Sequence, residues 1–268
     1  MAQKLSKSQQ MSQSLVLKVS IIKDVFSRVF IYHQYDSDEY WRKRASSKSL
    51  FWHNIYYNKC FRVKEFEIIH QLIRKYDIEK GDVLDVGCGW GEVSKFLVNI
   101  GFKHVDAVDF PEMINVAKKM NPHPQITYIA SAAQSYLVDK KYDLIISSGT
   151  FSMIREIPKM LTAINNCIIM TKEGGYILMI DPFHNSNLLA RAKISTEKII
   201  AYVEKKGLKL LERSGMLFWP IRILICNDTS LTEYQTRILF NVGESMLSKL
   251  GKNIWSDYKI LLFRKELR

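Results

Sequence analysis

Apolar and polar positions alternate with two different periods along this chain. From about residue 82 onward, short apolar runs of strand length are separated by longer segments in which apolar residues recur every three or four positions. The short runs are typical of buried strands, and the longer segments are typical of amphipathic helices. Strands that alternate with helices in this way form parallel sheets, so an α/β domain is predicted. The expected strands are 83–86, 104–109, 126–130, 144–147, 175–180, 208–213 and 258–264, and the expected helices are 91–100, 111–119, 158–170 and 196–206.

The residues before this domain follow a different pattern. Residues 15–30 read as an amphipathic helix, with apolar side chains such as Ile22 and Phe26 on one face and basic side chains on the others. An aromatic stretch follows and leads into a helix expected at 64–76. We therefore predict an N-terminal helical and aromatic cap, 1–63, before a main domain, 64–268.

One connection in the main domain is unusually long. Residues 221–255 separate the last two expected strands, and they contain a helix-like segment, 232–250. Long connections in compact domains are usually lids or binding elements. We therefore predict a helical insertion before the last strand.

Positive charge is concentrated near the N-terminus. The chain carries a net charge of +12, and its first 64 residues hold twelve Lys and Arg against four Asp and Glu. Such an excess suits an anionic partner, such as a phosphate-bearing substrate, a membrane surface or RNA, although solvated charge without a partner is more common. The apolar face of residues 15–30 could contact a membrane peripherally, cover the core, or join a second subunit in a homo-oligomer.

Three features narrow the class of protein. The sequence contains no apolar stretch long enough for a membrane-spanning helix, and its polar first ten residues lack the layout of a signal peptide. The four cysteines lie far apart, with neither a CxxC pair nor the spacing of a zinc site. We therefore expect a cytoplasmic protein with reduced thiols and no metal.

One of the expected strands runs into a glycine-rich turn. The run VLDVGCGWG begins as a short apolar strand that includes Asp85. It continues into a turn with three glycines, Gly87, Gly89 and Gly91. Glycine lets the backbone turn sharply and approach a ligand where a Cβ atom would collide. A dinucleotide-binding turn would carry a glycine where Glu92 stands, which weighs against a dehydrogenase.

A second acid, Asp109, ends the next expected strand. Folds of this kind place a carboxylate there to accept hydrogen bonds from ribose hydroxyls. The turn and this acid together resemble the motifs of the class I S-adenosylmethionine-dependent methyltransferases, and the chain follows that family's order of elements to about Arg264. The resemblance implies a Rossmann-like, seven-stranded, mostly parallel sheet with an antiparallel last strand. It also implies S-adenosylmethionine as cofactor and S-adenosylhomocysteine as product.

The same resemblance implies a set of cofactor-binding residues. The run VDFPEMI is similar to the family's stretch after the second acid, and YDLIISSGTF is similar to its fourth-strand motif. Ser131 stands where the family usually has Asp, and Ser152 and Met153 stand where many small-molecule relatives have Glu-His. The implied cofactor-binding residues are Asp85, Gly87, Cys88, Gly89, Gly91, Asp109, Phe110, Met113, Ser131, Ala132, Ser148 and Gly149.

Methyl transfer from a sulfonium needs alignment and exclusion of water more than it needs a base. If the acceptor must lose a proton, the first candidate for a general base is His184, which follows the fifth expected strand, 175–180. The second candidate is His53. Either could equally be a loop histidine without a catalytic part. The residues expected to line a substrate pocket are Trp52, Tyr56, Tyr57 and Trp219, although aromatic side chains more often simply pack a cap on a core.

The sequence therefore favours a methyltransferase that acts on a small-molecule or lipid-like acceptor. Two alternatives remain. The net charge and the run Arg42, Lys43 and Arg44 among aromatic residues would suit an RNA or DNA methyltransferase, but the chain lacks an NPPY-like or DPPY-like run after the fourth strand, which weighs against nucleic acid. The departures at Ser131 and Ser152 would suit a scaffold that binds the cofactor without catalysis.

Overall fold

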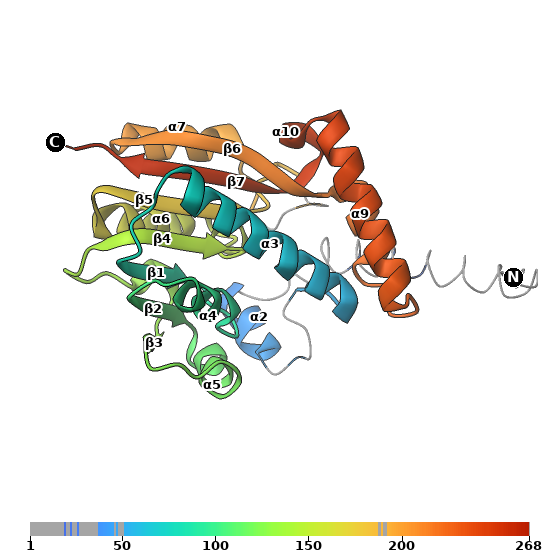
Figure 1. Ribbon diagram of the computed structural model, residues 1–268, viewed down its shortest axis with the longest axis horizontal. Coiled ribbons are helices and arrows are strands. Elements are labelled where there is room, and N and C mark those ends of the chain that lie inside the picture. Colours follow the sequence, from blue (N-terminus) through green and yellow to red (C-terminus); the bar gives the residue numbers. More distant parts are fainter. Residues whose placement is uncertain are drawn as a thin grey trace, which may run out of the picture.

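Seven strands in the described part of the chain form a single twisted sheet. The computed structural model describes residues 37–45, 47, 51–186, 189 and 192–267, together with Val19, Ile22 and Phe26. The strands are ordered β3-β2-β1-β4-β5-β7-β6 across the sheet (Figure 1). They are β1 (Asp82–Val86), β2 (His104–Asp109), β3 (Ile126–Ala130), β4 (Tyr142–Ser148), β5 (Thr171–Asp181), β6 (Leu208–Phe218) and β7 (Ser256–Lys265).

The strand directions confirm the predicted fold class. The pairs from β3 to β5 are parallel, whereas β7 runs antiparallel to both β5 and β6. Between β1 and β4 the strand order reverses, because the chain moves outward to β2 and β3 and then returns to the other side of β1. Ligands of open α/β sheets bind beyond the carboxyl ends of the strands at such a switch point.

Helices cover both faces of the sheet (Figure 1). One apolar core lies between the sheet and α3, α4 and α9, and a second lies between the sheet and α6 and α7. The helices are α2 (Ser37–Arg44), α3 (Ile55–Lys75), α4 (Glu92–Asn99), α5 (Pro111–Met120), α6 (Ile157–Met170), α7 (Thr196–Lys205), α8 (Trp219–Ile225), α9 (Glu233–Leu250) and α10 (Lys252–Trp255), with short 3₁₀ turns η2 (Ala133–Ser135) and η3 (Phe151–Met153).

Helix α3 is longer than the sequence pattern predicts. It begins at Ile55 rather than at Lys64, because the side chain of Asn54 caps it by accepting hydrogen bonds from the backbone N–H groups of Tyr56 and Tyr57, at 3.0 and 3.1 Å. The predicted boundary between residues 63 and 64 therefore falls inside a helix. The division into cap and main domain stays a prediction.

The predicted insertion consists of three helices, α8, α9 and α10, between β6 and β7. Helix α9 begins with a capping box, in which Thr232 and Gln235 satisfy each other's backbone N–H groups. Its buried side chains, among them Phe240 and Leu247, face α3 and β6. The insertion is therefore packed on the α3 face of the sheet.

Most of the predicted N-terminal helix, 15–30, lies outside the described residues. Among the described residues, no helix is both long and apolar enough to cross a bilayer.

Candidate functional site

The glycine turn lies at the switch point, directly after β1. Gly87, Gly89 and Gly91 all have left-handed backbone angles, with φ of 74°, 55° and 80°. A Cβ atom on Gly87 would lie 2.0 Å from the hydroxyl oxygen of Thr150, which follows β4. Only glycine fits there, because both the backbone angle and the close approach of the Thr150 side chain exclude a Cβ atom.

Asp109 sits at the end of β2 with its carboxylate held in place by the turn. One carboxylate oxygen accepts a hydrogen bond from the backbone N–H of Gly89, at 2.8 Å, and the other accepts one from Phe110, at 2.7 Å. Burial raises the pKa of Asp109 from 3.8 to about 6. Its oxygens retain further acceptor capacity, so the carboxylate can bind hydroxyl groups in the adjacent pocket.

Asp85 has a different task, although the sequence groups it with the turn. Its carboxylate is buried and accepts a hydrogen bond from the Ser94 hydroxyl on α4, at 2.6 Å. Burial raises the pKa of Asp85 to about 7. The contact joins the end of β1 to α4 across the glycine turn, so Asp85 fixes the path of the turn.

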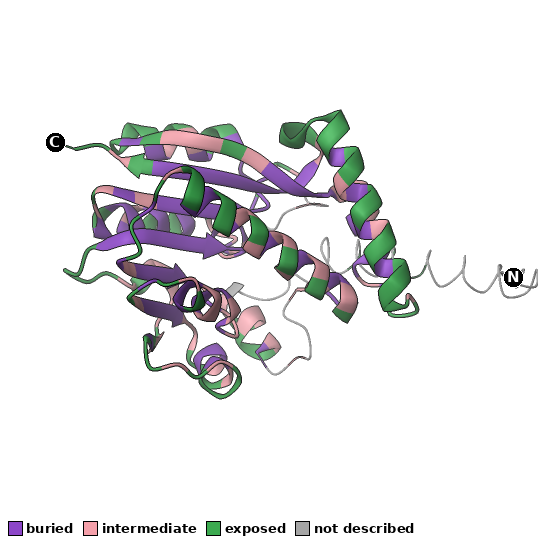
Figure 2. Ribbon diagram, viewed as in Figure 1, coloured by how far each residue is buried: buried purple, intermediate pink, exposed green. Residues whose placement is uncertain are grey.

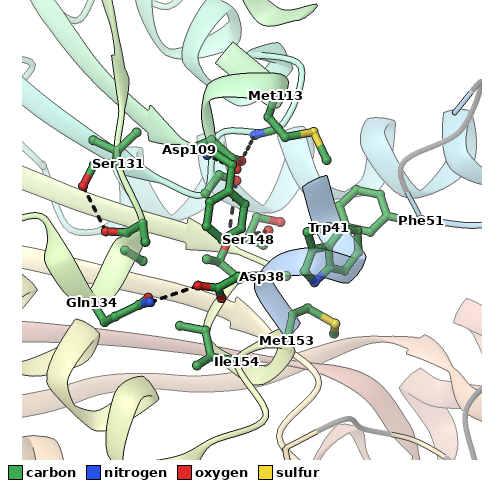
Figure 3. A pocket seen from close by; sticks show the side chains of 18 residues that line it. Asp38, Trp41, Phe51, Asp109, Met113, Ser131, Gln134, Ser148, Met153 and Ile154 are labelled. Atoms are coloured by element: carbon green, nitrogen blue, oxygen red, sulfur yellow. Dashed lines mark hydrogen bonds between the residues drawn. The ribbon is translucent and has the colours of Figure 1, made fainter. Parts of the chain in front are cut away.

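A pocket opens where the carboxyl ends of β1, β2 and β4 meet (Figure 3). Asp109 and the glycine turn form one side, and the short segments after β3 and β4 form another. The wall is mostly apolar, with few polar groups. Its residues are Asp38, Trp41, Phe51, Gly87, Gly89, Val108, Asp109, Phe110, Met113, Ser131, Ala132, Ala133, Gln134, Ser148, Gly149, Thr150, Met153 and Ile154.

Helix α2 covers this pocket (Figure 3). Asp38 and Trp41 line it from α2, and Gln134 donates a long hydrogen bond to Asp38, at 3.4 Å. On the outer side, the Arg42 guanidinium lies 3.1 Å from Glu112 of α5 and 4.7 Å from the centre of the Phe110 ring. Helix α2 is therefore attached on both sides of the pocket.

A buried carboxylate on α3 also reaches the site. Glu65 is fully buried, accepts a hydrogen bond from the Ser148 hydroxyl at the end of β4, and pairs with Arg62, which also contacts Glu92 at 2.9 Å. Burial raises the pKa of Glu65 above its usual value. Sequence reasoning missed it, because Glu65 sits in an ordinary helical pattern and only tertiary packing brings it to β4.

The structure brings most of the predicted cofactor-binding residues together around one pocket. Three of the predicted residues, Asp85, Cys88 and Gly91, do not line it and act nearby. Gly91 lies against Tyr128, where a Cβ atom would come within 2.3 Å of the phenol oxygen. The predicted residues that do line the pocket are Gly87, Gly89, Asp109, Phe110, Met113, Ser131, Ala132, Ser148 and Gly149.

Neither histidine proposed as a base lines this pocket. The Nε2 of His184 lies 2.6 Å from the backbone carbonyl oxygen of Asp257. Because a carbonyl only accepts, Nε2 carries the proton in this contact, and Nδ1 of the neutral ring is then the basic atom. The backbone N–H of His53 donates to the Asn227 side chain, at 3.0 Å, and His53 itself is exposed between the buried residues Trp52 and Asn54.

The four aromatic residues predicted to bind substrate lie outside this pocket as well. Trp52 and Tyr57 are buried and pack edge to face, with ring centres 4.9 Å apart, whereas Trp219 stacks on Trp255. Tyr56 lies beside the Lys59 ammonium group, at 5.3 Å. Their substrate-binding role stays a prediction. Two other aromatic residues of the N-terminal stretch, Trp41 and Phe51, do line the pocket.

A family model described as a methyltransferase domain matches residues 51–218, which is more than half of the chain. The chain belongs to the methyltransferase domain family. Its glycine turn, second acid and strand order are those of a class I S-adenosylmethionine-dependent methyltransferase.

Curated relatives of this methyltransferase are distant. The chain is 28% identical over 155 residues to a malonyl-[acyl-carrier protein] O-methyltransferase of Ilyobacter polytropus, a match that covers 57% of each chain. It is 26% identical to a ubiquinone biosynthesis O-methyltransferase of Vibrio parahaemolyticus, over 72% of this chain and 86% of that one. The chain thus spans little more than half the length of the first of these relatives.

A solved structure of the N-methyltransferase NodS from Bradyrhizobium japonicum, in complex with S-adenosyl-L-homocysteine, has the same fold. It superposes on the methyltransferase described here with a TM-score of 0.58 at 14% identity, over 86% of this chain and 99% of that one. At this identity the likeness shows the fold alone.

The pocket of this methyltransferase fits the cofactor that the family uses. Gly87 and Gly89 line the pocket with backbone alone, and the Asp109 carboxylate lies at its wall among apolar neighbours such as Met113 and Val108. A nucleoside needs this combination, because its ribose hydroxyls require an acceptor and its base requires apolar walls.

Proposed function

We propose that this methyltransferase transfers a methyl group from S-adenosylmethionine to a small-molecule or lipid-like acceptor. A negatively charged acceptor would be compatible with the basic N-terminus. The observation that carries the proposal is the mostly apolar pocket with Asp109 at one side and the glycine turn beneath it. The bound cofactor would supply a methyl group on a positively charged sulfur.

The residues around the pocket have separate tasks in this proposal. Asp109 would bind the ribose, and the apolar side chains of Phe110 and Met113 would hold the adenine. The backbone at Ser148 and Gly149 would face the reacting part of the cofactor, in the position where Glu65 restrains the end of β4. Helix α2 would keep water out, which favours transfer to the acceptor over hydrolysis.

The acceptor class is supported by two observations. The wall of the pocket is mostly apolar. The relative from Ilyobacter is named for malonyl-acyl-carrier protein, and the relative from Vibrio is named for ubiquinone biosynthesis. Neither name refers to a nucleic acid. These features favour a small or lipid-like acceptor over RNA.

The experiment that tests this proposal follows the methyl group. Purified protein is incubated with a cell extract and S-adenosylmethionine labelled in the methyl group, and the label is then measured in the lipid, small-molecule, RNA and protein fractions. We expect the label in the first two fractions. Label in RNA would replace the proposal with RNA modification, and no label in any fraction, with intact cofactor binding, would favour a scaffold without catalysis.

We further propose that His184 removes a proton from the acceptor through its Nδ1 atom, since its Nε2 is held by the Asp257 carbonyl. Replacement of His184 by alanine should then lower kcat about a hundredfold, the usual size of a general-base contribution, with cofactor affinity nearly intact. Raising the pH should restore part of the rate. The measurement is the pH profile of turnover with the acceptor identified above.

His53→Ala is the matched control, because His53 is the second candidate and is itself exposed. Its turnover should equal that of the wild type. If His53→Ala loses turnover and His184→Ala does not, the roles are reversed; if neither loses it, the reaction takes its base elsewhere or needs none.

We also propose that residues 15–30 touch a membrane surface. Val19, Ile22 and Phe26 are helical in the structure, share one face by their spacing, and have exposed fractions of 43%, 65% and 51%. Deletion of residues 1–30 should leave cofactor binding unchanged and should weaken sedimentation with anionic vesicles several-fold. A loss of thermal stability or of oligomeric state after the deletion would instead show that this segment is structural.

A further inference from the structure

Helix α9 carries a row of exposed apolar side chains along its outer surface. Every fourth position is apolar and exposed, and because an α-helix turns about 100° per residue, the row winds about 40° further around the helix at each step. The exposed fraction is 65% for Tyr234 and 45% for Val242. We call this row the α9 stripe; its members are Tyr234, Ile238, Val242, Met246 and Leu250, and it is extended by Ile254 of α10.

The α9 stripe is unlike the other exposed apolar residues of the described chain. On α6, across the sheet, Ile157 and Ile169 are exposed without such a continuous row between them. Figure 2 shows α9 as largely exposed along its length, with buried positions only where it meets the body of the molecule. Scattered apolar residues are normal on a surface, whereas a continuous row marks an interaction site.

Both basic and acidic residues lie beside the α9 stripe, with basic residues in excess. Helices α9 and α10 contain two acids, and both are engaged by the protein: Glu233 lies 3.9 Å from the Lys59 ammonium group, and Glu244 accepts a hydrogen bond from the backbone N–H of Leu217, at 2.8 Å. The basic residues of the same helices, Arg237, Lys249 and Lys252, are exposed. With three basic residues and two acids, the two helices carry a net charge of +1, and their exposed cations outnumber their exposed acids.

This charge decides between two partners for an apolar helix face. A second copy of the chain, related by a two-fold axis, would bring two identical basic faces together, and like charges oppose such a contact. A bilayer with anionic headgroups attracts Lys and Arg while it receives the apolar side chains. The α9 stripe has both of the features that an interfacial helix needs.

The stripe is also connected to the cofactor pocket. Asn54, which caps α3, donates hydrogen bonds to the Thr236 hydroxyl and to the Ile225 carbonyl oxygen, both at 3.1 Å. Two residues before it, Trp52 contacts Phe51, with ring centres 5.6 Å apart, and Phe51 lines the pocket. The segment that forms one wall of the pocket is thus attached to the buried side of α9, opposite the exposed side that a membrane would contact.

We infer that the α9 stripe is a docking surface for an anionic membrane. It binds by burying the apolar side chains of α9 among the lipid headgroups, while Arg237, Lys249 and Lys252 contact the headgroup charges. The inference rests on α9 itself and not on the chemical identity of the methyl acceptor.

The test compares two matched pairs of substitutions in the full-length protein. Val242→Ser with Met246→Ser changes the stripe, and Ile157→Ser with Ile169→Ser changes side chains of similar exposure on the opposite face. Binding to vesicles of equal parts phosphatidylglycerol and phosphatidylcholine is measured by sedimentation over a range of lipid concentrations. We expect the α9 pair to weaken partitioning roughly tenfold and the α6 pair to leave it unchanged.

Four further readouts make the result decisive. Binding should weaken with salt and should nearly disappear on vesicles of phosphatidylcholine alone, because the attraction is partly electrostatic. Cofactor affinity should be the same in both variants, which separates this inference from the proposed function. Equal partitioning of the two variants would overturn the inference, as would a wild-type dimer in light scattering that the α9 pair alone converts to a monomer.

Discussion

Replacement of Asp109 by alanine should weaken the binding of S-adenosylmethionine tenfold or more. The carboxylate is oriented by the N–H groups of Gly89 and Phe110, so it presents its remaining acceptor sites to the pocket at no further cost in ordering. A hydrogen bond to a charged group contributes about 1.5–3 kcal/mol, which corresponds to a tenfold to hundredfold loss. Equilibrium dialysis with labelled cofactor measures the loss, and circular dichroism confirms that the variant is folded.

The pH dependence of this loss gives an internal control. Burial raises the pKa of Asp109 to about 6, so in the free protein the carboxyl group is ionised at neutral pH and protonated below that value. Binding favours the ionised form, since charge-assisted hydrogen bonds are stronger, and this advantage is lost as the pH falls through 6. The cofactor affinity of the wild type should therefore fall towards that of the Asp109→Ala variant at low pH. A ratio of affinities that stays constant across this range would contradict the role of Asp109.

The second large effect concerns the stability of the insertion. Asp257, at the start of β7, is 1% exposed, and its carboxylate lies 2.8 Å from the Nε of Arg222 on α8, which is fully buried. Asp257→Asn keeps the shape of the side chain and removes its charge, so it leaves the Arg222 guanidinium without its nearest carboxylate. We expect the free energy of unfolding to fall by about 3–5 kcal/mol. For a chain of this size the melting temperature should drop by roughly 6 °C or more.

A surface ion pair offers the matched comparison. Glu197 lies 2.6 Å from Arg213, but it is 66% exposed. Glu197→Gln makes the same chemical change and should cost less than about 1 kcal/mol, because solvent already screens this pair. Thermal unfolding of both variants is measured in the same buffer. Equal losses in the free energy of unfolding would show that the Asp257 contact contributes no more to stability than a surface ion pair.

The sequence predicts the strands of the sheet well because each strand is recognised from residues that are consecutive in the chain. The observed limits of β2 and β3 are those predicted, although Asp106 interrupts the apolar run of β2 and only Ile126 of β3 is buried. The start of α3 was predicted wrongly, because the polar and aromatic residues near Asn54 show no apolar periodicity. The cap of that helix becomes visible only when the backbone conformation is known.

The site could be predicted only where its residues are consecutive in the chain. Gly87, Gly89 and Asp109 follow strand ends, so the motif places them correctly beside the pocket. Trp41 and Glu65 come from helices that precede the sheet, and nothing in their own neighbourhood indicates that they fold onto β4 or over the pocket. Contacts between distant elements of this kind depend on packing, which a single sequence does not reveal.

The most direct test of the whole account is a calorimetric titration of the full-length protein with S-adenosylmethionine, S-adenosylhomocysteine and NAD, each in turn. The pocket beneath α2 predicts saturable binding of the first two at one site per chain, with a dissociation constant in the micromolar range or tighter, and no binding of NAD. Binding of NAD without binding of either methyl-transfer ligand would contradict the account.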